Sequence, residues 1–392
     1  MALLDEREES SMEYSLYPFF EGEEYFTFAE PPTYFGLESG AAFGPITVNY
    51  QTYGKLSAEG DNAIYIAHAL TGYSLVGEPP GPHKERGWWE PLLGPGKALD
   101  TNRYFIVCCN VLGGCYGSTG PSSRDPKRGK PYAMKFPVVT IKDMVRVQKR
   151  LLDYLGIRKV LAVIGGSMGG MQALEWAVTY PRTVESIIAI GCSGRFSPNG
   201  IAFNQAARMA IMNEPAWQNG DYYGKEFPGR GLSLARIIAT ITYRSNESFE
   251  KRFGRSLQKA ENTNPFSFHE QFAVESYLHH QGEKITHRFD PNTYLYLTKA
   301  MDLHDLGRGH SSYHAGLKRI RGTVFLLGIS SDILFYPGEV RGLAVDLRRC
   351  GVDSRYEELK SPHGHDSFLI EFEQMESYLK SCLEEVENNR QH

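Results

Sequence analysis

The residues that point most clearly to chemistry form the pentapeptide Gly165-Gly166-Ser167-Met168-Gly169, which fits the pattern G-x-S-x-G. An apolar run at 160–164, typical of a strand buried on both faces, precedes it, and a helix is expected over 171–178. A serine between such a strand and a helix fits a nucleophile elbow, where small neighbours let the two elements pass closely. The pentapeptide alone is a weak signal, since an ordinary glycine turn can carry a serine. Its position makes Ser167 the candidate nucleophile.

A serine hydroxyl is a poor nucleophile without a base and an acid that orients the base. When the serine sits on such an elbow, the acid and then the histidine follow it along the chain. Asp332 comes just after a strand expected at 323–327, and His365 lies beyond the last expected strand. His363 competes with His365, which we favour because it opens the last expected helix. The sequence therefore predicts a triad of Ser167, Asp332 and His365.

Acyl transfer through a serine also needs N–H donors for the negative oxygen of the intermediate. One donor is expected from the backbone of Met168, the residue after the nucleophile. The second should come from the loop after an early strand at 64–67, where Leu70 is the candidate. His68, in the same loop, is interpreted as structural rather than as a base.

Strands and helices alternate around these residues. Further strands are expected at 104–109, 186–190 and 354–358, and helices over 140–155, 337–350 and 366–384. Thr140 is predicted to cap its helix and Gly156 to end it. This alternation predicts an α/β fold with a mostly parallel, doubly wound sheet.

The alternation stops between residues 195 and 315, which are expected to be mostly helical and polar. We interpret this block as a helical lid inserted into the α/β core. The predicted organisation is an acidic tail (1–35), a first part of the core (36–194), the lid (195–315) and a second part of the core (316–392).

Composition and charge exclude several classes of protein. Hydrophobic residues make up 41% of the 392 residues and charged residues 22%, which excludes a chain disordered throughout. No apolar run approaches the roughly 18–20 residues of a membrane helix. The net charge of −4 argues against a nucleic-acid partner. Residues 1–30 hold nine acids and one base, so the remainder carries +4, which suits an anionic substrate.

Other signals favour no cofactor, metal or disulfide. The six cysteines show no paired spacing and no secretory signal is evident, so reduced thiols in a cytoplasmic protein are expected. His310 and His314 are four residues apart but lack a third metal ligand at suitable spacing. The glycine-rich run 113–120 lacks the Lys-Ser/Thr ending of a phosphate loop.

Taken together, several motifs resemble the homoserine O-acetyltransferase family of α/β-hydrolase-fold enzymes, over about residues 35–385. The motifs are Ala67 to Gly72, Gly87-Trp88-Trp89, Gly94-Pro95-Gly96, Asn110 to Pro121, Gly165 to Trp176, Phe203-Asn204, Ala206-Ala207-Arg208, Ala300-Met301-Asp302, His304-Asp305 and Gly364-His365-Asp366. The resemblance implies that the serine takes an acetyl group from acetyl-CoA and passes it to the hydroxyl of L-homoserine, a step toward methionine. It also implies a homodimer formed through the lid, with acetyl-CoA as a substrate and no bound cofactor.

The resemblance further implies three substrate-binding residues: Arg236 for the homoserine carboxylate, Asp366 for the ammonium group, and Tyr243 near that arginine. A zwitterionic substrate does require one cation and one anion, and arginine offers a two-pronged donor to a carboxylate. If 232–244 is helical, Arg236 and Tyr243 share a face, whereas a strand would separate them.

Several alternatives remain open: succinyl-CoA as donor, L-serine as acceptor, a serine esterase that uses water, or a non-catalytic binding module. Tyr73-Ser74 and His363 depart from the family's usual pattern, and these departures bear on donor and acceptor specificity.

Overall fold

A computed structural model describes residues 23–78, 87–258, 266, 268 and 272–390; residues 1–22 of the predicted acidic tail lie outside this part. The main sheet has strands β1 (Glu24–Phe28), β4 (Ile46–Tyr53), β5 (Ala63–Ala67), β6 (Phe105–Cys109), β9 (Val160–Gly166), β10 (Ser186–Ile190), β11 (Thr323–Ile329) and β12 (Ser354–Leu359). Their order is β1-β4-β6-β5-β9-β10-β11-β12. β4 runs in the direction opposite to the other seven strands, which are parallel to one another, so the predicted mostly parallel sheet is confirmed. Two small sheets pair β2 (Phe35–Gly36) with β3 (Ala42–Phe43) and β7 (Arg124–Asp125) with β8 (Lys130–Pro131).

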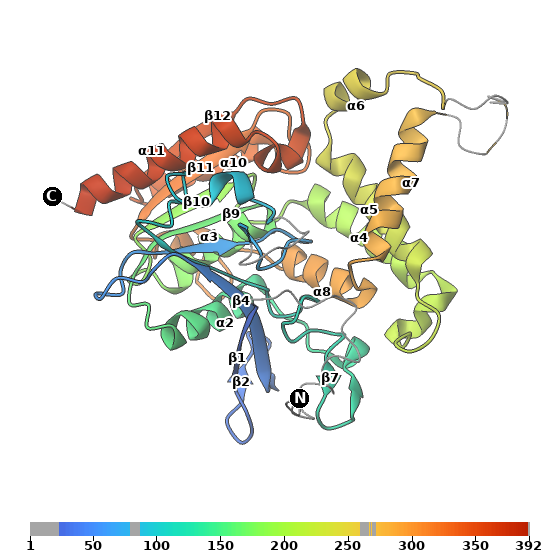
Figure 1. Cartoon of the computed structure of the whole chain (residues 1–392), viewed down its shortest axis with the longest axis horizontal. Coiled ribbons are helices and arrows are strands. Elements are labelled where there is room, and N and C mark those ends of the chain that lie inside the picture. The colour runs from blue at the N-terminus through green and yellow to red at the C-terminus, as the bar shows by residue number, and fades with distance from the viewer. Residues whose placement is uncertain (1–22, 79–86, 259–265, 267, 269–271, 391–392) are drawn as a thin grey trace, which may run out of the picture.

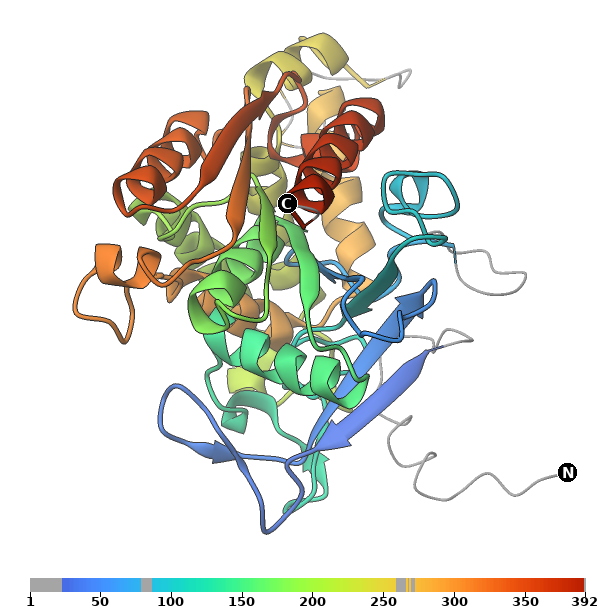
Figure 2. The ribbon, with the colours of Figure 1, turned by 90° about the vertical axis from the view of Figure 1, so that its left-hand side faces the viewer.

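Helices cover both faces of this sheet (Figure 2). They are α2 (Ile141–Tyr154), α3 (Met168–Thr179), α10 (Pro337–Arg349) and α11 (Phe372–Arg390). Side chains of α2, α3 and α10 join one buried apolar cluster, and those of α11 join another. In β9, Val163 belongs to the first cluster and Ile164 to the second, because successive residues of a strand point to opposite faces. The continuous apolar run at 160–164 is thus explained by burial on both sides.

Local signals set the bounds of α2 as predicted. Thr140 accepts a hydrogen bond from the Asp143 N–H, and the Asp143 carboxylate accepts one from the Thr140 N–H. This reciprocal capping box satisfies N–H groups that the first turn leaves free. Gly156, with φ at +76°, turns the chain away after the helix.

The predicted helical block forms a lid at one side of the sheet (Figure 1). Its helices are α4 (Pro198–Met212), α5 (Gly229–Tyr243), α6 (Asn246–Arg252), α7 (Ala273–Thr286) and α8 (Pro291–Asp302). Helix α5 packs between α4 and α7. The last helix of the block, α9 (Tyr313–Leu317), instead contacts α10 of the core.

The prediction that residues 1–35 form only a tail is wrong for Glu24–Phe28, which pair antiparallel with β4 at the edge of the sheet. Phe26 stacks on Phe28 and on Tyr154 of α2, with ring centroids 5.3 and 4.5 Å apart. The many acidic residues of the segment favoured its interpretation as a tail, although aromatic residues alternate along it. The strand forms through contacts with residues that are distant in the sequence.

The single helix predicted over 366–384 is also wrong, since the chain forms a short 3-10 helix, η4 (Gly364–Leu369), and then α11. The Phe368 carbonyl accepts a hydrogen bond of 3.0 Å from Trp89 Nε1, so it is directed away from the following turn. The Phe368 ring packs directly against Gly166, because a Cβ added to Gly166 would lie only 2.6 Å from the nearest atom of that ring. Packing of Phe368 against the elbow therefore bends the chain before α11.

No helix in the part of the chain described is both long and apolar enough to cross a membrane. All six cysteines are free thiols, and five of them are buried.

Candidate active site

Ser167 occupies the sharp turn between β9 and α3. Its φ of 58° and ψ of −123° are strained for a residue with a side chain. A Cβ on Gly169 would lie 2.0 Å from the Ala67 carbonyl oxygen, and one on Gly165 would lie 2.4 Å from the Gly169 backbone. Only glycine fits at either position, so the two glycines permit the turn that presents the serine. The N-terminus of α3, which favours negative charge, begins at the next residue.

His365 and Asp332 are joined by a short hydrogen bond, with Nδ1 2.6 Å from Oδ2. The other carboxylate oxygen of Asp332 accepts hydrogen bonds from the N–H groups of Leu334 (2.8 Å) and Phe335 (2.9 Å). Both side chains are buried. The carboxylate is thereby held on both oxygens and fixes the histidine tautomer with its proton on Nδ1, so Nε2 can accept a proton.

The His365 ring is enclosed by aromatic side chains. Phe335 stacks on it with centroids 5.2 Å apart, and Tyr243 lies 5.7 Å away. Its Nε2 is buried and has no hydrogen-bond partner among the described residues. Burial lowers the pKa of His365, but the charge and hydrogen bond of Asp332, together with the charge of Asp366, outweigh it and raise the pKa above the ordinary value.

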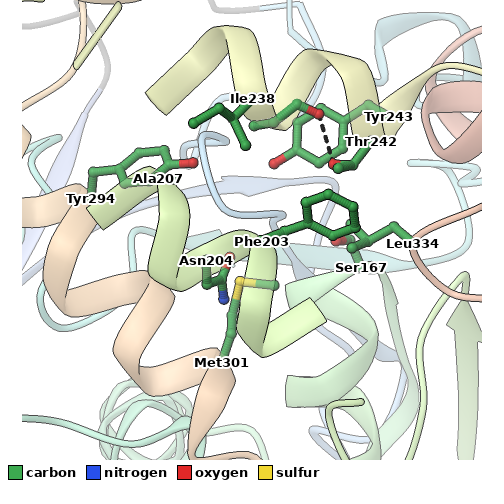
Figure 3. A pocket seen from close by; sticks show the side chains of 11 residues that line it. Ser167, Phe203, Asn204, Ala207, Ile238, Thr242, Tyr243, Tyr294, Met301 and Leu334 are labelled. Atoms are coloured by element: carbon green, nitrogen blue, oxygen red, sulfur yellow. Dashed lines mark hydrogen bonds between the residues drawn. The ribbon is translucent and has the colours of Figure 1, made fainter. Parts of the chain in front are cut away.

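A pocket opens from Ser167 into the lid, with a volume of about 340 Å³ that includes space open to solvent. Its lining residues come from the elbow, α4, α5, α8 and the loop after β11: Ser167, Phe203, Asn204, Ala207, Ile238, Ala239, Thr242, Tyr243, Tyr294, Met301 and Leu334. Figure 3 shows Ser167 and Leu334 toward one end of this pocket and Tyr294 toward the other. The lid thus builds most of the wall above the candidate nucleophile.

Tyr243 lies beside this histidine, and Arg236 and Asp366 lie near enough to Tyr243 for their charges to act on it. Arg236 and Tyr243 both lie on α5, as the helical interpretation required, and the guanidinium lies 5.6 Å from the centre of the Tyr243 ring. Burial raises the pKa of Tyr243 to about 12, with Arg236 lowering it and Asp366 raising it further. A cation and an anion therefore both act on one tyrosine beside His365.

Arg244 is a residue that the sequence reasoning missed. Its Nη2 lies 3.4 Å from Oδ2 of Asp366, so that carboxylate already has a cationic neighbour in the protein. The backbone of 243–245 closes over Gly364, where a Cβ would lie 2.6 Å from the Tyr243 carbonyl oxygen. No local pattern in the sequence indicates the contact between Arg244 and Asp366. The position of Arg244 directly after the candidate Tyr243 is the one hint that it could lie near the site.

Asn204 and Arg208 belong to motifs that carry the family resemblance, but no role could be predicted for either residue from the sequence. Asn204 lines the pocket and donates to Asp302 Oδ1 at 2.9 Å, and Arg208 contacts Asp302 Oδ2 at 2.6 Å. Asp302 thus connects two residues of α4 to α8 and stiffens this wall.

The loop after β5 lies against the elbow and carries Leu70. Gln172 of α3 donates from Nε2 to the His68 carbonyl oxygen at 3.1 Å, which holds the loop against the helix. Within the described residues, neither the Leu70 nor the Met168 backbone N–H donates to an acceptor. Both N–H groups are therefore available to a substrate oxygen.

The sheet order, the elbow between β9 and α3, and the acid and histidine after β11 and β12 define an α/β-hydrolase-fold protein. A family model described as alpha/beta hydrolase fold matches residues 62–372, and the chain belongs to this class.

Comparison with known proteins identifies the family to which the chain belongs within this class. The chain is 51% identical over 355 residues to the homoserine O-acetyltransferase of Carboxydothermus hydrogenoformans, covering 90% of this chain and 94% of that protein. The crystal structure of homoserine O-acetyltransferase from Bacillus anthracis matches with a TM-score of 0.84 and 31% identity, over 92% of this chain and 97% of that one. The chain belongs to the homoserine O-acetyltransferase family. Esterase E22 also matches, with a TM-score of 0.84 and 28% identity, over 92% of this chain and 99% of the other.

Proposed function

We propose that this protein transfers an acetyl group from acetyl-CoA to the hydroxyl of L-homoserine, giving O-acetyl-L-homoserine and CoA for methionine biosynthesis. The observation that carries the proposal is the strained Ser167 in the wall of a lid pocket, together with a buried His365–Asp332 pair whose Nε2 has no hydrogen-bond partner among the described residues. Half of the residues are identical to a homoserine O-acetyltransferase over nine-tenths of the chain, which supports the choice of substrates.

In the first half-reaction, His365 Nε2 takes the proton of Ser167 as the hydroxyl oxygen attacks the thioester carbonyl carbon. The N–H groups of Leu70 and Met168 hold the resulting oxyanion. Collapse breaks the carbon–sulfur bond, and the sulfur leaves as CoA with the proton from His365. In the second half-reaction, the homoserine hydroxyl gives its proton to His365 and attacks the acetyl ester. Collapse then releases the product, and Ser167 regains its proton.

Acceptor binding is assigned to the polar groups around Tyr243. Arg236 would bind the homoserine carboxylate, Asp366 the ammonium group, and Tyr243 would lie between them. Because Arg244 contacts Asp366, an arriving ammonium group would share this carboxylate with a fixed cation.

The lining of the pocket favours acetyl over succinyl transfer. None of the residues that line it is an arginine, lysine or histidine. A succinyl carboxylate would lose hydration against this lining, and the nearby Arg236 is assigned to the carboxylate of homoserine, whereas an acetyl methyl group loses nothing. We propose no bound cofactor, since this chemistry needs only serine, histidine and backbone donors.

The test is to follow thiol release from acetyl-CoA and succinyl-CoA, each with L-homoserine, L-serine or no acceptor. We expect sustained release only with acetyl-CoA and homoserine, with at most one thiol released per active site when the acceptor is omitted. Sustained release without an acceptor would instead identify a hydrolase, and faster release with succinyl-CoA would contradict the assigned donor.

We also propose a homodimer formed through the lid, in the cytoplasm where acetyl-CoA is available. The lid carries exposed apolar side chains, namely Leu234 and Ile241, seven residues apart on α5, and Met209 and Met212 on α4.

Light scattering should give twice the 44.1 kDa mass of the chain. Replacing Leu234 and Ile241 with lysine should give monomers, while the same change at the exposed Val138, which lies outside the lid helices, should not. A monomeric wild-type protein would rule out the proposed dimer.

A further inference from the structure

His68 has both ring nitrogens engaged by backbone groups next to the candidate oxyanion donor. Its Nδ1 lies 2.8 Å from the Ala69 carbonyl oxygen, and its Nε2 accepts a hydrogen bond of 3.1 Å from the Val111 N–H. A carbonyl oxygen can only accept and an amide N–H can only donate, so the ring is neutral with its proton on Nδ1. Burial lowers the pKa of His68 to about 4, against the weaker raising effect of its bond to Ala69. The ring therefore stays in this state at neutral pH and cannot serve as a base there.

The peptide that His68 contacts is the one that carries the Leu70 N–H. The Ala69 carbonyl and the Leu70 amide belong to a single planar unit, so orienting one end orients the other. The Ala69 oxygen also accepts a hydrogen bond of 2.9 Å from the Gly72 N–H, which closes a tight turn. A carbonyl that accepts two hydrogen bonds polarises its peptide and strengthens the N–H at the opposite end.

We infer that His68 is a positioning residue for the oxyanion site, acting through the Ala69–Leu70 peptide. It fixes the direction of the Leu70 N–H and increases its strength as a donor to the thioester oxygen in the transition state. The inference rests on the proposed function, in which Leu70 is one of the two donors. It makes a buried histidine important for acyl transfer although its ring touches no reacting atom.

Two substitutions separate the two bonds of the ring. Asparagine places an amide nitrogen at the position of Nδ1, so His68→Asn keeps the donor to Ala69. Glutamine reaches the position of Nε2 with an acceptor oxygen, so His68→Gln keeps the bond from Val111 and loses the donor to Ala69. His304→Gln is the matched control, because His304 is also buried, has a pKa lowered to about 4 by burial, and contacts a backbone carbonyl, that of Ser193.

The spectroscopic measurement is the frequency of the carbonyl stretch of the acetyl-enzyme. The acetyl-enzyme is formed with acetyl-CoA in the absence of an acceptor. The difference between infrared spectra recorded with carbon-13-labelled and unlabelled acetyl groups identifies the band. Weaker hydrogen bonds to this carbonyl shift the band to higher frequency. We expect that shift in His68→Gln. Its kcat should fall at least tenfold, but by less than the roughly 10²–10³-fold loss that follows removal of a whole oxyanion donor. KM for homoserine should change little, and His68→Asn and His304→Gln should resemble the wild type in band position.

An unchanged band in His68→Gln, or equal kcat losses in His68→Gln and His68→Asn, would overturn the inference. A wild-type enzyme that forms no acetyl-enzyme band would contradict the proposed function instead, so the two failures are distinct. If neither His68 variant folds, nitrogen-15 spectra of the wild-type histidines decide. We expect one neutral ring protonated on Nδ1 that does not titrate between about pH 6 and 9, and the absence of any such ring would equally overturn the inference.

Discussion

Ser167→Ala is expected to lower kcat for CoA release by about 10⁶-fold, the loss typical of removing the nucleophile of a serine triad. The change removes one oxygen atom and the only group at this position that can carry the acetyl ester. The fold should tolerate it, because alanine has the same Cβ as serine at the observed φ of 58°. Thiol release in a stopped-flow or end-point assay measures the loss, and mass spectrometry should show that the chain no longer gains an acetyl group.

The control for this experiment is Ser354→Ala. Ser354 is also buried, but it begins β12, and its hydroxyl donates to the Ala344 carbonyl at 2.9 Å. We expect Ser354→Ala to cost some thermal stability and little activity, and Ser167→Ala to show the reverse. Turnover retained in Ser167→Ala beyond trace wild-type contamination would refute the acyl-enzyme mechanism.

Asp332→Asn is expected to lower kcat by about 10⁴-fold without unfolding the site. The asparagine oxygen can still accept the hydrogen bonds from Leu334 and Phe335, so the loop should keep its shape. Its amide group would then face His365 and donate to Nδ1, which moves the histidine proton to Nε2. In that tautomer the nitrogen nearest the substrate cannot accept a proton.

The pH profile provides a second measurement of the same change. A base must be unprotonated to act, so activity falls as the pH drops through the pKa of His365. Asp332 is the main cause that raises this pKa, and without it burial would lower the pKa. The acid limb of the residual activity should therefore move to lower pH in Asp332→Asn.

Glu339→Gln is the control for the loss of a nearby charge. Burial and the charge of Asp332 raise the pKa of Glu339, so this carboxyl lies near enough to Asp332 to interact with its charge. We expect an activity close to that of the wild type. A similar loss in both variants would mean that net charge, rather than the Asp332–His365 hydrogen bond, governs the rate.

The sequence alone was sufficient to predict the elements that depend on local chemistry. Gly165, Ser167 and Gly169 lie within five residues, and the steric demand of that turn is visible in the residue types themselves. The same holds for the Thr140 cap and for the strand at 160–164, whose apolar run reflects burial on both faces. The mostly parallel sheet follows from the alternation of such segments.

Other features were decided only by tertiary structure. The short strand Glu24–Phe28 was hidden by its acidic neighbours, because its pairing energy comes from β4 and its packing from Tyr154. The break before α11 depends on Trp89, which lies 279 residues from the carbonyl that it binds.

The site shows the same division. Ser167, Asp332 and His365 could be named as candidates from the sequence, and the structure pairs the last two, but the Arg244–Asp366 contact and the two bonds of the His68 ring could not be foreseen. Residue types and local spacing record what a turn or a helix needs from its own segment. Which distant backbone groups meet a given ring or carboxylate is set by how the lid and loops pack on the sheet, and no short stretch of sequence contains that information.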